Sequence, residues 1–138
     1  MKYIVYIILI VCEVVVAKEL VVIANKDFPD KNLSIEEIRT IFLDKKRFVN
    51  DKKLLVMNYE ANHSLRKCFE KSILKKSKRS LERYWRKAYY QGKRPPKIIK
   101  SKEMLFSYLD NVSPSIGYSE TKDTVDKNVT ILYRIKCD

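Results

Sequence analysis

The fold of this chain is decided by residues 19–42, which read ELVVIANKDFPDKNLSIEEIRTIF. Residues 20–24 are an unbroken apolar run rich in β-branched side chains, which is typical of a strand buried on both faces. After a polar loop, Ser34 stands three residues before Glu37, a spacing that forms a capping box at a helix start. Apolar side chains then recur at helical spacing, at Ile35, Ile38, Ile41 and Phe42. A buried strand followed by an amphipathic helix indicates an α/β fold.

The rest of the chain continues this alternation. Three further strands are expected, at 54–57, 115–118 and 129–133, and residues 98–99 form either a strand or an extended connector. Further helices are expected to begin near Ser64, at Ser77 or Ser80, and near Ser101. Because 138 residues suit one domain, we predict a single α/β domain over residues 18–138. Its central sheet would be flanked by about four helices.

Composition excludes several classes of protein. Apolar residues make up 46% of the chain, which is enough for a core and excludes wholesale disorder. Only 2 glycines leave no room for a glycine-rich nucleotide loop. A single His and 3 Cys do not supply the paired four-ligand sets of structural zinc sites. We therefore expect neither a cofactor nor a metal site.

Residues 1–17, MKYIVYIILIVCEVVVA, have the pattern of a secretory signal peptide. Lys2 gives the positive start, residues 4–11 are an apolar run, and Ala17 ends the segment with a small side chain. A retained membrane anchor is the less favoured interpretation, because Glu13 interrupts the run before the roughly 20 apolar residues of a membrane-spanning helix. We expect cleavage after Ala17 and export to the periplasm or cell envelope.

Cysteine usage leaves two questions open. Cys12 follows Leu-Ile-Val as in a bacterial lipoprotein box, although Val11 stands where such boxes carry a smaller residue, so lipidation is the alternative to cleavage after Ala17. In an oxidising compartment Cys68 and Cys137 would be able to pair. Cys68, however, falls on the apolar stripe of the helix expected from Ser64, where a free thiol packs as a small hydrophobe. We predict two free thiols, with the disulfide as the alternative.

Positive charge is concentrated in residues 64–94, which hold 12 Lys or Arg against two acids within a chain of net charge +12. Such a face either keeps the protein soluble or attracts a polyanion or an acidic envelope surface. Nucleic acid is not an expected partner, since the chain is predicted to be exported and carries no nucleic-acid-binding motif. Tyr84, Trp85 and Tyr89 fall on the apolar stripe of the helix, so we interpret them, unlike Tyr90, as core residues rather than a stacking platform.

Five segments in order resemble a known family. Residues 33–46, LSIEEIRTIFLDKK, resemble the "LSxEEIxxIFLGKK" segment of small exported phosphate-binding-like proteins. Four later matches follow, at Asn58 with Ser64-Leu65-Arg66 and Phe69, at Tyr84-Trp85, at Gly92-Lys93 with Pro95-Pro96, and at residues 113–118, SPSIGY. These proteins are relatives of the substrate-binding component of phosphate ABC transporters. The resemblance implies a type 2 periplasmic-binding-protein-like fold.

The departures from the family pattern concern the ligand. The chain resembles only the later lobe of the full-length proteins, which close on phosphate between two lobes. Ser64-Leu65-Arg66 stands where the transporter proteins carry a Ser-Gly-Thr turn, and Asp44 replaces the usual Gly. The resemblance therefore implies one of the two lobes between which the full-length proteins enclose phosphate.

A candidate oxyanion site lies at the expected start of the second helix. Ser64 would present a hydroxyl and free backbone N–H groups, Arg66 a planar fork suited to phosphate, and Asn62 and His63 lie alongside. A serine in this position is also the commonest helix cap and needs no ligand. We do not expect an enzyme, because His63 and Ser64 have no third group to orient them as a nucleophile pair.

Two functions remain open. In the first, the protein is a solute-binding-like module for phosphate or another small oxyanion, with a membrane permease of an ABC transporter as partner. In the second, the lobe has no ligand and serves as an interaction or adaptor module for a membrane, envelope or secretion partner.

Overall fold

The structure is a computed structural model that describes residues 18–137. The predicted signal peptide, its cleavage site after Ala17 and the lipoprotein box at Cys12 lie outside these residues. None of the helices within the described part is long and apolar enough to cross a membrane.

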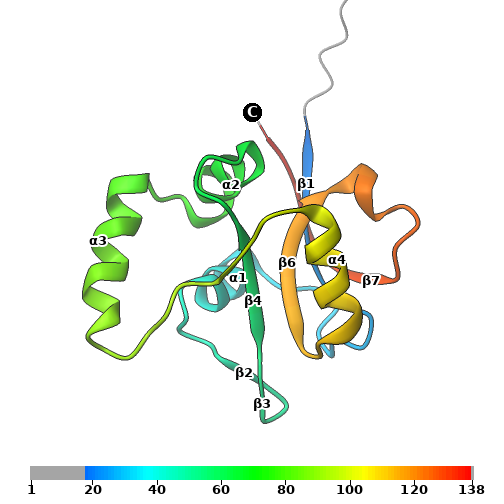
Figure 1. Ribbon diagram of the computed structural model, residues 1–138, viewed down its shortest axis with the longest axis horizontal. Helices are drawn as coiled ribbons and strands as arrows, with labels where there is room; N and C mark the ends of the chain where they lie inside the picture. The colour runs from blue at the N-terminus through cyan, green and yellow to red at the C-terminus, as the bar shows by residue number, and fades with distance from the viewer. Residues whose placement is uncertain (1–17, 138) are drawn as a thin grey trace, which may run out of the picture.

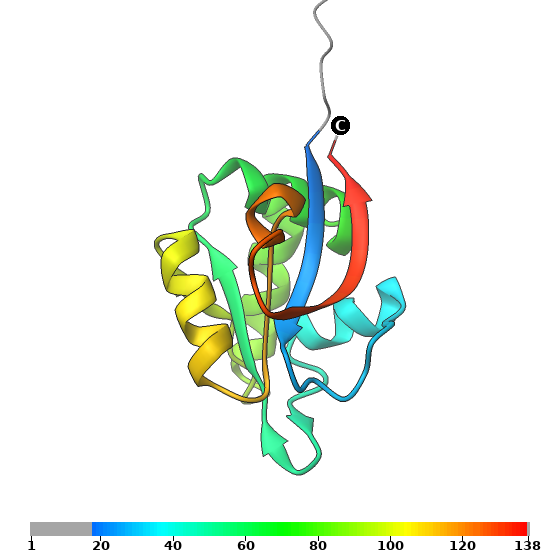
Figure 2. The same ribbon diagram turned by 90° about the vertical axis from the view of Figure 1, so that its right-hand side faces the viewer.

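A five-stranded sheet forms the centre of the molecule, in the order β5-β4-β6-β1-β7. Its strands are β1 (Glu19–Asn25), β4 (Leu55–Tyr59), β5 (Lys97–Ile99), β6 (Ser115–Glu120) and β7 (Val129–Lys136). β4 runs parallel to β5 and β6, whereas β1 pairs antiparallel with β6 and β7. β1 and β7 therefore lie side by side, and the two ends of the described chain meet at one end of the sheet (Figure 2). All expected strands are confirmed, and residues 98–99 belong to a strand.

Within residues 18–137, four α-helices and two short helical turns surround the sheet. They are α1 (Ile35–Phe42), α2 (Ser64–Phe69), α3 (Lys78–Tyr89) and α4 (Lys102–Asn111), with a π-helical turn η1 (Glu70–Leu74) and a 3-10 turn η2 (Thr121–Thr124). A small hairpin of β2 (Phe48–Val49) and β3 (Lys52–Lys53) projects from one end of the molecule (Figure 1). The predicted α/β fold, with a central sheet flanked by about four helices, is confirmed.

Helix caps follow the sequence signals at three of the four α-helices. The hydroxyls of Ser34, Ser77 and Ser101 each accept a hydrogen bond of 3.1 Å from a backbone N–H three residues later. α2 begins at Ser64 as expected, but its cap is His63, so the interpretation of Ser64 as the cap is wrong. Three of the expected helix starts are therefore set by local side-chain chemistry.

The core lies on both faces of β1. The side chains of residues 20–24 are fully buried, as the apolar run predicts. α4 covers one face, where the Cα of Gly117 lies so close to Leu105 that a Cβ would stand 2.6 Å from the Leu105 Cδ1 atom. On the other face Phe69 of α2 stacks on Tyr118, with ring centroids 4.2 Å apart.

Cys68 and Cys137 form a disulfide, so the prediction of two free thiols is wrong. Their Cα atoms are 5.6 Å apart, although they are 69 positions apart in the sequence. The backbone N–H of Cys137 donates to the Lys18 carbonyl over 2.7 Å, which carries the end of β7 along the start of β1. This pairing brings Cys137 to the half-buried Cys68.

The aromatic side chains of α3 do not all belong to the core. Tyr84 and Trp85 are half-buried, and the Tyr84 hydroxyl donates to the Leu43 carbonyl over 2.6 Å. Tyr89 is 57% exposed and Tyr90 86%, so the assignment of Tyr89 to the core is wrong. α3 lies beyond the β4 and β5 edge of the sheet (Figure 1), where a helix presents only a narrow stripe to the core.

Candidate functional site

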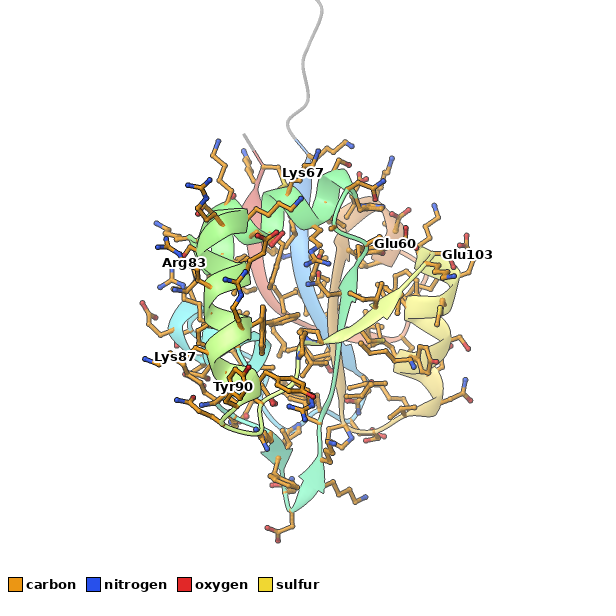
Figure 3. All side chains as sticks on the ribbon, turned by 60° about the vertical axis from the view of Figure 1, so that its left-hand side comes forward. Glu60, Lys67, Arg83, Lys87, Tyr90 and Glu103 are labelled. Atoms are coloured by element: carbon orange, nitrogen blue, oxygen red, sulfur yellow. A yellow bond between two sulfur atoms is a disulfide. The ribbon has the colours of Figure 1, made fainter. Side chains whose placement is uncertain are left out.

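The candidate residues lie where three parallel strands end. β5, β4 and β6 point their carboxyl ends to the same edge of the sheet. In open α/β sheets, ligands bind outside this edge. β4 ends at Tyr59, a turn follows in which the His63 N–H donates to the Glu60 carbonyl over 2.9 Å, and α2 begins. Figure 3 shows Glu60 at this end of β4 and Lys67 above it on α2.

His63 holds the start of α2. Its Nδ1 accepts a hydrogen bond of 3.1 Å from the Leu65 N–H, and its ring stacks on Tyr59 with centroids 4.3 Å apart. This aromatic contact fixes the imidazole over the helix end, which explains why His63 takes the cap that serine usually occupies. Ser64 and Asn62 are exposed on either side.

Arg66 is tied to the protein itself. Its Nη1 donates to the Tyr59 carbonyl over 2.8 Å, and its Nε donates to Glu70 Oε1 over 3.3 Å. Only 22% of its side chain is exposed. The guanidinium thus braces the end of β4 against α2, and part of its charge is balanced by Glu70.

Two cavities separate the predicted site residues. A cavity of about 750 Å³ between α2, η1 and the start of α3 is lined by Asn62, Ser77 and five lysines, and we call it the lysine cavity. A second cavity of about 470 Å³, the tryptophan groove, lies between α3 and the sheet edge and is lined by Arg66, Trp85, Pro95, Pro96 and Ile98. The structure brings His63 and Ser64 together on one turn, but it places Asn62 and Arg66 on the walls of different cavities.

A buried polar network supports the strand ends. The Tyr118 hydroxyl donates to the Asn58 side-chain oxygen and lies 3.5 Å from the Tyr59 N–H, which donates to it. Burial raises the pKa of both Tyr118 and Tyr59 well above the ordinary value. Both phenols are therefore neutral hydrogen-bonding groups at ordinary pH. Asn58, one of the residues of the resemblance, belongs to this network and also lines the tryptophan groove.

The lysine cavity was not anticipated as a site. The charge count of residues 64–94 indicated a basic surface, but it carried no information on which cations would share one space. Within residues 18–137, no group of three His, Cys, Asp or Glu side chains is placed to hold a metal ion.

Comparison by sequence gives no family, because no family model and no curated protein matches the chain. Solved structures match its fold. An ABC-type phosphate transport receptor from Vibrio cholerae superposes with a TM-score of 0.65 at 21% identity, over 83% of this chain and 45% of that one.

Two further structures give the same result. A protein from Clostridium perfringens, assigned as a phosphate ABC transporter substrate-binding protein and solved with bound phosphate, has a TM-score of 0.66 at 20% identity, over 84% and 45% of the two chains. PstS from Borrelia burgdorferi has a TM-score of 0.65 at 17% identity, over 84% and 47%. The chain therefore has the fold of phosphate ABC transporter substrate-binding proteins and spans less than half of their length, consistent with a single lobe.

Proposed function

We propose that this protein is an exported, non-enzymatic solute-binding-like protein that binds phosphate or a similar small oxyanion at the start of α2. One observation carries the proposal: Asn62, His63 and Ser64 are exposed at the carboxyl edge of three parallel strands, where ligands of open α/β sheets bind. The likeness to a structure solved with bound phosphate supports the ligand class.

The donors for an oxyanion come mainly from the turn and the backbone. The first intrahelical hydrogen bond of α2 is made by the Lys67 N–H, which donates to the His63 carbonyl over 3.1 Å. The N–H groups of Ser64 and Arg66 precede it and have no intrahelical acceptor. The Ser64 hydroxyl and the Asn62 amide add two side-chain donors. The Arg66 guanidinium already donates to the Tyr59 carbonyl and to Glu70, so it would contribute its positive charge to the site rather than a bidentate pair of hydrogen bonds.

The affinity of such a site would be weak. A single lobe leaves the anion half in water, where each hydrogen bond contributes less than in an enclosed cleft. A dissociation constant of ~1 mM corresponds to about −4 kcal/mol. A membrane permease of an ABC transporter, or another envelope protein, would then supply the second wall.

Export belongs to the same proposal. Residues 1–17 would be removed as a signal peptide, so the protein recovered from the cell envelope would have an intact mass that begins at Lys18. A mass that begins at Cys12 with acyl chains would make the protein a lipoprotein instead. The full-length mass would show a retained anchor.

The binding site is tested by calorimetric titration of inorganic phosphate at fixed ionic strength. Ser64→Asp places a carboxylate beside the proposed site, and an acid in the first turn of a helix is compatible with folding. We expect this variant to weaken phosphate binding at least tenfold. Asn128→Asp, which adds the same charge on an exposed loop after η2, is the matched control and should bind like the wild type. Equal losses in the two variants would contradict a localised site.

The adaptor function is the second candidate, and the internal hydrogen bonds of Arg66 favour it. A guanidinium that braces β4 against α2 is explained without any ligand. If the folded protein gives no binding heat with phosphate at millimolar concentrations, a ligand-less lobe that contacts a membrane or secretion partner becomes the better description.

A further inference from the structure

The lysine cavity gathers positive charge that the protein itself does not neutralise. Its five lysines are Lys67, Lys71, Lys75, Lys76 and Lys78. The acidic residue among the lining residues is Glu70, whose carboxylate pairs with Arg66. None of the ion pairs formed within residues 18–137 includes one of these lysines. The cavity therefore carries a net positive field open to a ligand.

The backbone of α2, η1 and the start of α3 places these lysines around one cavity. Lys67 and Lys71 are four residues apart on α2 and η1, which follow each other without a break, and like charges at this spacing destabilise a helix. Lys75 ends η1 in the left-handed region with φ of 52°, which turns the chain toward Ser77 and the start of α3. The first turn of α3 holds no acidic residue. The Lys76 Nζ lies 5.9 Å from the centre of the Tyr84 ring, but no ion pair within residues 18–137 offsets the repulsion among these lysines.

The lysine cavity differs from the rest of the basic surface in shape. Arg83 and Lys87 point outward from α3, so their charges diverge into solvent (Figure 3). Such a convex face is sufficient to keep a protein soluble. The five lysines instead line an open cavity of about 750 Å³. This volume lies within the range of small-molecule sites and exceeds what one phosphate ion fills.

We propose that the lysine cavity binds a compact polyvalent anion made of linked phosphate groups. Ammonium groups act as point charges toward phosphate oxygens, and several of them can engage successive phosphates of one ligand. Asn62, whose amide also belongs to the proposed orthophosphate site, lies on the wall of this cavity, so the two sites adjoin. This proposal concerns a second site and does not rest on phosphate binding at the start of α2.

The test uses inorganic tripolyphosphate, titrated calorimetrically into the purified protein at a constant, near-physiological ionic strength. We expect saturable binding at least tenfold tighter than that of orthophosphate. Lys71→Ala should weaken it at least fivefold. Lys87→Ala removes the same charge from the outer face of α3 and should change it less than twofold. Ser64→Asp should affect orthophosphate far more than tripolyphosphate, so that the two sites fail independently.

Three results would overturn the proposal. Equal losses for Lys71→Ala and Lys87→Ala would mean a diffuse positive surface, and absence of saturable binding would mean no site. A short polyglutamate peptide that binds as tightly as tripolyphosphate, with the same loss in Lys71→Ala, would assign the cavity to an acidic protein partner instead. Co-sedimentation with phosphatidylcholine vesicles that contain a lipid diphosphate, reversed by tripolyphosphate, would identify a lipid headgroup as the source of the phosphates. Absence of co-sedimentation would identify a soluble anion as the source.

Discussion

β1 and α3 are the two extremes of this molecule. Five consecutive side chains of β1, at residues 20–24, are fully buried between helices on both faces. α3 has twelve residues and buries only Leu81 and Ala88, while its remaining length carries arginines, lysines and exposed tyrosines. Both elements are regular and both were predicted from the sequence, but β1 is buried in the core and α3 is mostly exposed to solvent.

The difference separates what holds the fold from what is free to bind. Burial of apolar area stabilises the sheet and the helices packed on it. α2 and η1 bury Phe69 and Ile73 in that core, but their outward faces and most of α3 lie outside it and concentrate the positive charge. Substitutions in the core should therefore change stability, and substitutions on the basic surface should change binding.

The largest effect is expected at the aromatic stack on β6. Phe69 is fully buried against Tyr118 and Phe42, so Phe69→Ala should cost about 3–5 kcal/mol of unfolding free energy through lost burial and a cavity. Tyr90→Ala on the exposed end of α3 should change it by no more than about 0.5 kcal/mol. Urea unfolding followed by circular dichroism gives both values. Similar costs for the two variants would remove the distinction between core and basic surface.

The disulfide should give the next largest effect. The Cys68–Cys137 bond closes a long loop and joins α2 to the end of β7. Reduction, or the paired change of both residues to Ser, should destabilise the protein by about 2–4 kcal/mol. Peptide mapping after thiol labelling under denaturing, non-reducing conditions should find neither Cys68 nor Cys137 labelled. Labelling of both would restore the original expectation of free thiols.

The Tyr118 hydroxyl should contribute a smaller amount. Tyr118→Phe leaves the buried Asn58 oxygen without its donor, at a cost of about 1–3 kcal/mol at neutral pH. The measurement is the shift of the urea midpoint relative to wild type. A variant as stable as wild type would show that water or a rearranged Asn58 replaces the hydroxyl.

The same network predicts a pH dependence. Burial raises the pKa of Tyr118 and Tyr59 in the folded protein, so above about pH 10 the unfolded phenols lose protons that the folded ones keep. Stability is constant with respect to these groups below that pH and falls above it, by about 1.4 kcal/mol per pH unit for each tyrosine. Tyr118→Phe should reduce the slope of unfolding free energy against pH above pH 10 by the contribution of one tyrosine. An unchanged slope would mean that Tyr118 ionises in the folded state.

The smallest effect is expected at Glu19, at the start of β1. A hydrogen bond of 2.9 Å from the Thr121 hydroxyl, followed by one from Arg134, lowers the pKa of the Glu19 carboxyl. The associated stability is present above the ordinary pKa of this group and is lost as the pH falls through the lowered value. Glu19→Gln should reduce the melting temperature slightly at neutral pH and leave it unchanged in strong acid. An equal reduction at both pH values would point to packing rather than charge.

Local patterns predicted the parts of the fold that depend on neighbours in the sequence. The unbroken apolar run of β1 and the Ser34 cap of α1 needed no tertiary information. The disulfide did, because it depends on the pairing of Cys137 with Lys18 beneath α2. The exposure of Tyr89 likewise depends on where α3 lies relative to the sheet edge.

Only the part of the candidate site that depends on local sequence was predicted. The position of residues 62–64 at a helix start followed from the apolar pattern. The cap at His63 depends on its stacking with Tyr59, and the bonds of Arg66 depend on the Tyr59 carbonyl and Glu70. The lysine cavity required the left-handed turn at Lys75, which no local signal predicts for a lysine.

Amide chemical-shift mapping during a phosphate titration tests the central claim most directly. If the start of α2 is the oxyanion site, the backbone N–H signals of residues 62–66 shift most and approach saturation at constant ionic strength. Shifts that spread over the exposed arginines and lysines of α3 and grow without saturation would contradict the account, because the anion would then only be attracted to a positive surface.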